Sequence, residues 1–193
     1  MPEIITLDEL KDIANRQILN ENTTLDAIIK TASEDEYDKN TFLSYSSKDK
    51  AILPAVIAIL EGHNGKVYTD RGDSRLPKVT SVETAQVLKD TIKALPRMVV
   101  FVTSNSKDSK WIPWELGLGD GAKTNYDIAI FPSADKVYDT TWLEQEYLGL
   151  YRRIVWGKHE DYDKEIWMVY NRKEHTATPL SKWLDTNSTR GIL

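Results

Sequence analysis

The sequence predicts an α/β domain built around a mostly parallel sheet. From residue 40 onward, short apolar runs alternate with amphipathic segments, which is the pattern of consecutive β/α units. The run Met98–Val102 is apolar throughout, as expected of a central parallel strand that is covered on both faces. A length of 193 residues is enough for one domain of ordinary size with a real core.

Residues 1–38 are predicted to form a helical extension ahead of the α/β domain, which we place at residues 39–193. Thr6 and Glu9 have the spacing of a capping box, in which the threonine oxygen accepts from the glutamate amide while the glutamate side chain returns to the threonine amide. Apolar residues follow at helical intervals, and a second helix is predicted to begin near Thr24.

The first β/α unit is predicted from residue 41. Thr41–Tyr45 is a candidate strand, and Ala51–Leu60 is a candidate helix that tolerates Pro54 only near its first turn. Gly65 marks a turn into a second strand, Lys66–Thr69.

The next units are predicted on either side of a long loop, residues 70–80. A capping box at Thr80 and Glu83 begins a helix. Its buried stripe is expected to consist of Ala85, Leu88, Ile92 and Leu95. The strand Met98–Val102 follows, and the shorter run Ile128–Phe131 predicts a fourth strand.

The last third of the chain gives weaker signals. The glycine-rich run Gly117–Gly121 is expected to form the C-terminal turn of a helix. Arg153–Trp156 and Trp167–Tyr170 are both strand-like, but only one of them need belong to the parallel sheet. The other is free to pair antiparallel at an edge.

Composition and charge exclude several classes of protein. A formal net charge of −5 argues against a nucleic-acid partner, because phosphate recognition needs clustered Lys and Arg. No apolar run approaches the ~20 residues that span a bilayer, so we expect no membrane partner. Met1–Leu10 has acidic residues where a signal peptide has basic ones. Cysteine is absent, which suits the cytoplasmic location that we expect.

The functional site is expected at the carboxyl ends of the strands, where open parallel sheets bind ligands. Four loops of the predicted sheet would meet there. They are Ser44–Asp49, Asp70–Thr80, Ser104–Glu115 and Pro132–Ser133. Within the first of these loops, we expect Asp49 to have a structural role as the cap of the first helix.

Trp111 and Glu115 are the most informative pair in these loops. Their i, i+4 spacing places an aromatic ring beside a carboxylate on one face of a helix. A pyridinium or an aromatic base can stack on the ring while the carboxylate accepts from a sugar hydroxyl. The alternative interpretation is that Trp111 and Trp114 are core residues and Glu115 is a charge on the helix surface.

Other chemistries have little support in the sequence. Neither of the common glycine-rich phosphate-binding motifs is present. His63, His159 and His175 are scattered without the spacing of metal ligands, so we expect neither a metal nor a catalytic triad. Phosphoacceptor receiver domains share the fold pattern, but they need an acidic cluster where this chain has Ser44-Tyr45-Ser46.

Three segments together resemble the conserved boxes of TIR (Toll/interleukin-1 receptor) domains. FLSYSSKD, Phe42–Asp49, is similar to the first box. Asp70–Pro77 resembles the second box, the BB loop, although receptor TIR domains have Pro-Gly near its tip. SKWIPWELG, Ser109–Gly117, resembles the S-x-W-x-x-x-E segment of enzymatic TIR domains, whose glutamate is catalytic. The agreement in order and spacing extends over roughly residues 40–156.

The resemblance implies a flavodoxin-like fold with five parallel strands and an activity that cleaves the nicotinamide–ribose bond of NAD+. It assigns the catalytic role to Glu115. NAD+ is then a substrate, and neither a cofactor nor a metal is expected. Contacts to the substrate are expected from Ser44, Tyr45, Ser46, Arg71 and Trp111.

The chain is similar in organisation to stand-alone bacterial TIR proteins of Thoeris-type antiphage defence. This similarity implies self-association through TIR–TIR contacts and a cyclic ADP-ribose messenger that activates a separate effector protein. Two alternatives remain. One is a non-catalytic TIR adaptor, scaffold or host-directed effector, and the other is a flavodoxin-like enzyme that cleaves nucleosides and leaves NAD+ intact.

Overall fold

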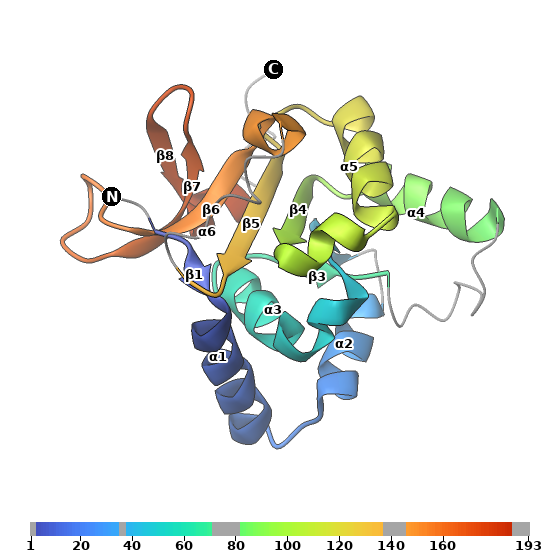
Figure 1. Ribbon diagram of the computed structural model, residues 1–193, viewed down its shortest axis with the longest axis horizontal. Helices are drawn as coiled ribbons and strands as arrows, with labels where there is room; N and C mark the ends of the chain where they lie inside the picture. The colour runs from blue at the N-terminus through green and yellow to red at the C-terminus, as the bar shows by residue number, and fades with distance from the viewer. Residues whose placement is uncertain (1–2, 35–37, 71–81, 137–145, 187–193) are drawn as a thin grey trace.

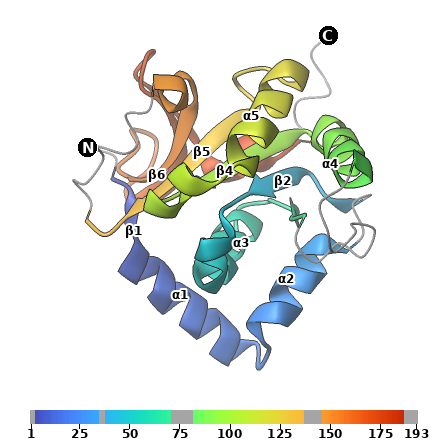
Figure 2. The ribbon, with the colours of Figure 1, turned by 45° about the vertical axis from the view of Figure 1, so that its right-hand side comes forward.

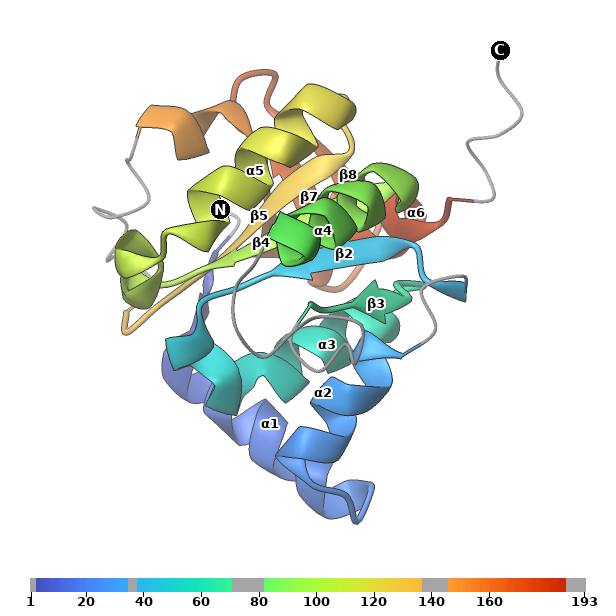
Figure 3. The same ribbon diagram turned by 90° about the vertical axis from the view of Figure 1, so that its right-hand side faces the viewer.

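A sheet forms the middle layer of the molecule, with helices on both of its faces (Figure 3). The computed structural model describes residues 3–34, 38–70, 82–136 and 146–186. One face of the sheet is covered by α1 (Leu7–Asn20), α2 (Leu25–Ser33) and α3 (Leu53–Glu61), and the other by α4 (Val82–Ala94) and α5 (Trp111–Ala122) (Figure 1).

Five parallel strands make up the core of the sheet, as the sequence predicts. In spatial order they are β3 (Val67–Tyr68), β2 (Thr41–Ser44), β4 (Arg97–Val102), β5 (Ile128–Ala134) and β6 (Arg152–Gly157). Numbered along the chain within this set, the order is 2-1-3-4-5, which is that of flavodoxin-like folds. The predicted fold class is therefore confirmed.

The sheet continues beyond these five strands. β7 (Ile166–Asn171) pairs antiparallel with β6, and β8 (Thr176–Pro179) pairs antiparallel with β7. The expectation that only one of the two late strand-like segments joins the parallel sheet is confirmed. A short helix, α6 (Leu180–Leu184), follows β8.

A two-residue strand near the N-terminus also joins the sheet. β1 (Ile5–Thr6) pairs in parallel with Ser133 and Ala134 at the end of β5 (Figure 2). Glu3, just before it, forms an isolated antiparallel bridge with Trp156 of β6. This pairing explains why β5 extends to Ala134 and not only to Phe131, where the sequence pattern ends the strand.

Both predicted helices of the N-terminal segment are present. Thr6 caps α1 in a capping box with Glu9, and the side chain of Thr24 caps α2. Leu10 and Ala14 of α1 share one hydrophobic cluster with the apolar side chains of α3. The domain boundary at residue 38 stays a prediction, and the described part of the segment contributes to the core of the α/β domain.

Two apolar clusters cover the two faces of the sheet. Residues of α1, α2, α3 and α6 fill one of them, and residues of α4 and α5 fill the other. Leu88 and Ile92 of α4 and Leu95 just after it are buried as predicted, and Ala85 is half-buried. Thr80 of the predicted second capping box lies outside the described residues. Within the described ranges, no helix combines the length and the hydropathy needed to cross a membrane.

The glycine run of residues 117–121 lies in the last turns of α5, which ends at Ala122, so the expectation that it forms the C-terminal turn of a helix is confirmed. At Gly119, an added Cβ atom would overlap the sulfur of Met98 in β4. Glycine here allows the helix backbone to approach the sheet closely.

Candidate functional site

The carboxyl ends of β2 and β4 define the point where the order of the strands reverses. The chain leaves β2 toward α3 on one face of the sheet and leaves β4 toward α5 on the other (Figure 3). In flavodoxin-like folds, ligands bind in the crevice at this point. The side chains that follow β2 and β4 are therefore the strongest candidates for a site.

Ser44 and Glu115 meet at this point. Ser44 is the last residue of β2, and Glu115 lies in the second turn of α5. The Ser44 hydroxyl donates a hydrogen bond to Oε2 of Glu115. Both side chains are buried, and that of Glu115 is only 4% exposed. The alternative that places Glu115 on the helix surface is therefore inconsistent with the structure.

Trp111 begins α5, one turn before Glu115. Its ring is half-buried against the apolar cluster beneath α4 and α5. Trp114 contacts it edge to face, with the ring centroids 5.2 Å apart, and is 37% exposed. Trp111 thus has both a packed side and an accessible side, whereas Trp114 is not a core residue.

Tyr45 and Ser46 do not accompany Ser44 toward Glu115. Side chains alternate along a strand, and Tyr45 accordingly belongs to the apolar cluster on the opposite face, with α3. Ser46 caps the 3₁₀ helix η2 (Ser47–Ile52), where its hydroxyl accepts from the amide of Lys48 at 3.4 Å. Of the first box, Ser44 is the residue whose side chain donates to Glu115.

Asp49 is a buried bridge between two loops, and the prediction that it caps the first helix is wrong, because α3 begins after Ile52 without a side-chain cap and Ser46 caps η2. The Asp49 carboxylate, 3% exposed, accepts from Thr103 Oγ1 at 2.8 Å and from Asn105 Nδ2 at 2.6 Å. Burial raises the pKa of Asp49, although these two donors act in the opposite direction. Asp49 therefore holds the loop after β2 against the loop after β4.

The loop that resembles the second TIR box falls mostly on residues 71–81, which lie outside the described residues. Arg71, the expected contact for the pyrophosphate, is among them.

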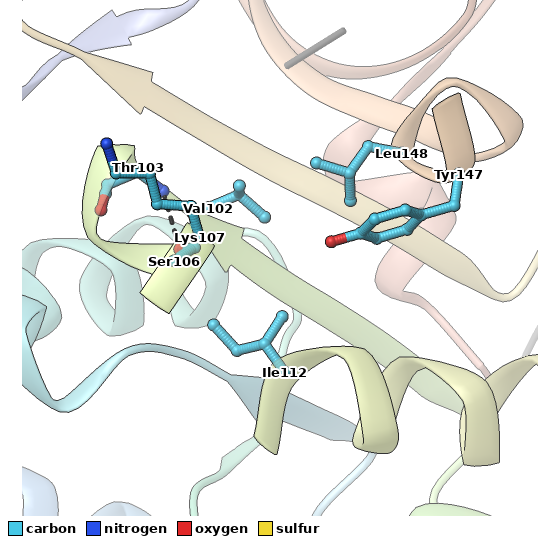
Figure 4. Close-up of a pocket in the computed structure, with 7 residues that line it drawn as sticks. All are labelled: Val102, Thr103, Ser106, Lys107, Ile112, Tyr147 and Leu148. Atoms are coloured by element: carbon cyan, nitrogen blue, oxygen red, sulfur yellow. Dashed lines mark hydrogen bonds between the residues drawn. The ribbon is translucent and has the colours of Figure 1, made fainter. Parts of the chain in front are cut away.

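A small pocket lies between the end of β4, the first turn of α5 and the segment around Tyr147 (Figure 4). Val102 of β4 and Ile112 of α5 form one side, and Tyr147 of the 3₁₀ helix η5 (Glu146–Leu150) points into it. Burial raises the pKa of the Tyr147 phenol, which favours its protonated, hydrogen-bond-donating form. Thr103, Ser106, Lys107 and Leu148 complete the lining.

The pocket has a volume of only about 10 Å³, close to the minimum that holds one water molecule. This pocket, as the described residues form it, is too small to hold a nucleotide. Tyr147 is absent from the residues predicted from the sequence, because nothing local to residues 146–150 indicates that they fold back over α5.

No group of three or more His, Asp or Glu side chains that could hold a metal ion occurs in the part of the chain that the structure describes.

The chain is similar to a known protein over nearly its whole length. It is 32% identical over 184 residues to a protein of Bacillus cereus (strain MSX-D12) named "Probable 3' cyclic ADP-D-ribose synthase ThsB'". The alignment covers 92% of this chain and 93% of that protein, so the similarity includes the N-terminal segment as well as the α/β core. No protein-family model matches the chain.

Proposed function

Because the chain belongs to the Thoeris-type TIR proteins, the family of its Bacillus cereus relative, we propose that it converts NAD+ into a cyclic ADP-ribose that acts as a signal in antiphage defence. The relative is named as a synthase of 3′ cyclic ADP-D-ribose. One observation of the site carries the proposal: Glu115 lies at the carboxyl edge of the sheet, beside the reversal of strand order, with Ser44 holding its carboxylate.

The proposed reaction breaks the bond between the ribose and the nicotinamide nitrogen. The bonding electron pair leaves with the nitrogen, so a cationic pyridinium departs as neutral nicotinamide. No general acid is needed, which distinguishes this step from hydrolysis by the paired carboxylates of ordinary glycosidases. Glu115 stabilises the oxocarbenium-like ribose by its negative charge and by accepting from a ribose hydroxyl.

Cyclisation follows when a nucleophile of the same molecule captures the ribosyl cation. A hydroxyl oxygen or an adenine nitrogen forms the new bond, and a hydroxyl that reacts loses its proton. Reactants held in good geometry gain effective molarities of ~10⁵–10⁸ M over free reactants, provided that water is kept out. The burial of Glu115 supports such exclusion of water.

The remaining predicted contacts are assigned within this proposal. The accessible side of Trp111 stacks on an aromatic ring of the substrate, and Tyr147 donates from the opposite side of the pocket. Ser44 orients Glu115, while Tyr45 and Ser46 shape the floor of the site through the loop after β2. Arg71 contacts the pyrophosphate.

The proposal includes two partners. TIR–TIR contacts between copies of the chain promote access of NAD+ to Glu115, and the nucleotide product activates a separate effector protein.

Incubation of the purified protein with NAD+ tests the proposal. We expect release of nicotinamide and, by mass spectrometry, a nucleotide product lighter than ADP-ribose by one water. Glu115→Gln should abolish both, because the amide keeps the size of the side chain and still accepts from Ser44 but has no charge. Glu34→Gln, on an exposed glutamate at the end of α2, is the matched control and should retain full activity.

Three results would favour other functions. An active Glu115→Gln variant would remove the catalytic assignment, and linear ADP-ribose as the sole nucleotide product would indicate a plain NAD+ hydrolase. Wild-type protein that leaves NAD+ intact would indicate a TIR adaptor, or a nucleoside-cleaving enzyme if nucleosides are cleaved instead.

A further inference from the structure

A second and larger cavity lies where the N-terminal segment crosses the β6–β7 hairpin. Its volume of about 340 Å³ is within the range typical of small-molecule sites. Ile4 and Ile5, around β1, and Ile13 of α1 provide its apolar lining. Ile5 and Ile13 belong to the cluster on the α1–α3 face of the sheet, whereas Glu115 lies beneath α5 on the opposite face. The cavity is thus separate from the proposed catalytic site. Binding of a ligand in the cavity would therefore not depend on whether the proposed function is correct.

Two tryptophan rings form a corner of this cavity. The rings of Trp156 in β6 and Trp167 in β7 lie 5.5 Å apart between centroids, with their planes at 66°. Trp156 Nε1 donates to Glu165 at 3.2 Å, and Trp167 packs against Phe131 at 5.4 Å. These contacts fix both rings, while Trp156 remains 38% exposed and available to a ligand.

The rim of the cavity is acidic. Three carboxylates, those of Glu3, Glu9 and Asp12, line it together with a single guanidinium, that of Arg16. Arg16 Nε donates to the backbone carbonyl of Asp12 at 3.2 Å, and the Glu9 carboxylate accepts from Thr6 in the capping box. Within the described ranges, neither the Glu3 nor the Asp12 carboxylate forms an ion pair or a side-chain hydrogen bond, so both can interact with a ligand.

We infer that this cavity binds an organic cation with an ammonium head group. The π faces of tryptophan attract cations more strongly than those of the other aromatic residues, and aromatic corners of this kind recognise quaternary ammonium groups. The surplus of carboxylates adds a favourable charge interaction and disfavours phosphate-bearing ligands. The ligand would contact α1, β1, β6 and β7 together, and would therefore tie the N-terminal segment to the hairpin.

Calorimetric titration of the full chain with choline tests this inference. The neutral isostere 3,3-dimethylbutan-1-ol has the same shape without the charge, and we expect it to bind about tenfold or more weakly than choline. Trp156→Leu should weaken choline binding about tenfold, and Trp156→Phe, which keeps a smaller π face, should weaken it less. N-acetyl-lysine amide is titrated in parallel as a stand-in for a lysine side chain. Tighter binding of this compound than of choline would indicate the side chain of a protein partner as the source of the cation, and tighter binding of choline would indicate a free small molecule.

Two charge variants complete the design. Asp12→Asn removes a carboxylate from the rim and should weaken choline binding about threefold. Glu160→Gln removes an exposed carboxylate from the β6–β7 hairpin that does not line the cavity, and should leave binding unchanged. Three outcomes would each overturn the inference. They are equal affinity for choline and its neutral isostere, no binding of either choline or N-acetyl-lysine amide, and equal effects of Asp12→Asn and Glu160→Gln. Circular dichroism of every variant verifies that it is folded.

Discussion

The hydroxyl of Ser44 donates a hydrogen bond to the carboxylate of Glu115 and so joins the end of β2 to the second turn of α5. Both groups are buried, where a hydrogen bond contributes more than it does in water. The contact therefore fixes the proposed catalytic carboxylate at the point where the strand order reverses.

Ser44→Ala is expected to lower both stability and activity. The variant removes the hydroxyl that donates to Oε2 of Glu115, and a buried polar group that loses a partner costs about 1–3 kcal/mol. Urea denaturation measures the first effect and nicotinamide release the second. Ser133→Ala is the matched control, because Ser133 is equally buried near the end of β5 and its hydroxyl has no hydrogen-bond partner in the described residues. Equal losses in the two variants would contradict a specific role for Ser44.

Asp49→Asn is expected to change how stability depends on pH. Burial raises the pKa of Asp49 above its ordinary value of 3.8, so in the window just above pH 3.8 the folded protein holds a proton that the unfolded chain releases. In the wild type, the free energy of unfolding contributed by Asp49 therefore falls as the pH rises through this window. The variant has no such proton, so its stability relative to the wild type should increase with pH.

Denaturation curves across that pH window, with Asp163→Asn as an exposed control for net charge, measure the difference. A relative stability that stays constant with pH would show that Asp49 titrates in the same way in the folded and unfolded states. The variant is also expected to lose one of the two hydrogen bonds from Thr103 and Asn105, since an amide offers only one oxygen.

Two glycines of the same helix are expected to respond to alanine in opposite directions. Gly119→Ala places a Cβ atom against Met98 in the core, and overpacking of this kind typically costs about 1–3 kcal/mol. Gly117 has open space around it, so Gly117→Ala should stabilise α5 by up to about 1 kcal/mol through helix propensity. Thermal melting of the two variants tests the close approach of α5 to β4. Stabilisation by both substitutions would show that Met98 moves aside at little cost.

The regular elements follow from local patterns, and the departures from prediction follow from contacts distant in sequence. Capping residues and apolar periodicity are sufficient to predict α1, α2 and most of the strands. β1 has only two residues, and it becomes a strand because Ser133 and Ala134 of β5 are available to pair with it. The composition of the glycine run ending at Gly121 predicts the end of a helix, and α5 ends there, but the close approach of Gly119 to Met98 depends on a contact distant in sequence.

The candidate site, too, depends on contacts between residues that are distant in sequence. The spacing of Trp111 and Glu115 predicts their common helix, but the burial of Glu115 depends on Ser44, which is 71 positions away in the chain. One feature was accessible from the sequence alone: strand alternation sends Ser44 and Tyr45 to opposite faces, so the two could not both face Glu115. The loop of residues 71–81, and Arg71 with it, lies outside the described residues.

Trp111 and Trp114 are expected to differ in their effect on activity. Trp111→Ala should reduce nicotinamide release strongly, because it removes the proposed stacking surface. Its cost in stability should be below the ~3–5 kcal/mol typical of a fully buried tryptophan, since the ring is only half-buried. Trp114→Ala should keep most of the activity, since this ring is exposed, contacts Trp111 edge to face and is not assigned to the substrate. Loss of folding in Trp111→Ala with unchanged activity of the folded fraction would favour a purely structural role.

Activity is expected to rise more steeply than linearly with protein concentration. Among the described residues Glu115 is only 4% exposed, and the pocket beside Ile112 and Tyr147 has room for about one water molecule, so we expect the isolated chain to admit NAD+ poorly. If only a small fraction of molecules is open, the apparent affinity for substrate falls by that fraction, and contacts with a second copy that favour the open state restore it.

Mixing experiments separate this mechanism from simple mass action on the substrate. Inactive Glu115→Gln protein, added to a fixed and dilute amount of wild type, should raise the rate of nicotinamide release, because the inactive copies still supply TIR–TIR contacts. An unrelated protein at the same concentration controls for crowding, which favours compact states only weakly. A rate strictly proportional to wild-type concentration, and unaffected by the inactive copies, would mean that each chain opens its site without a partner.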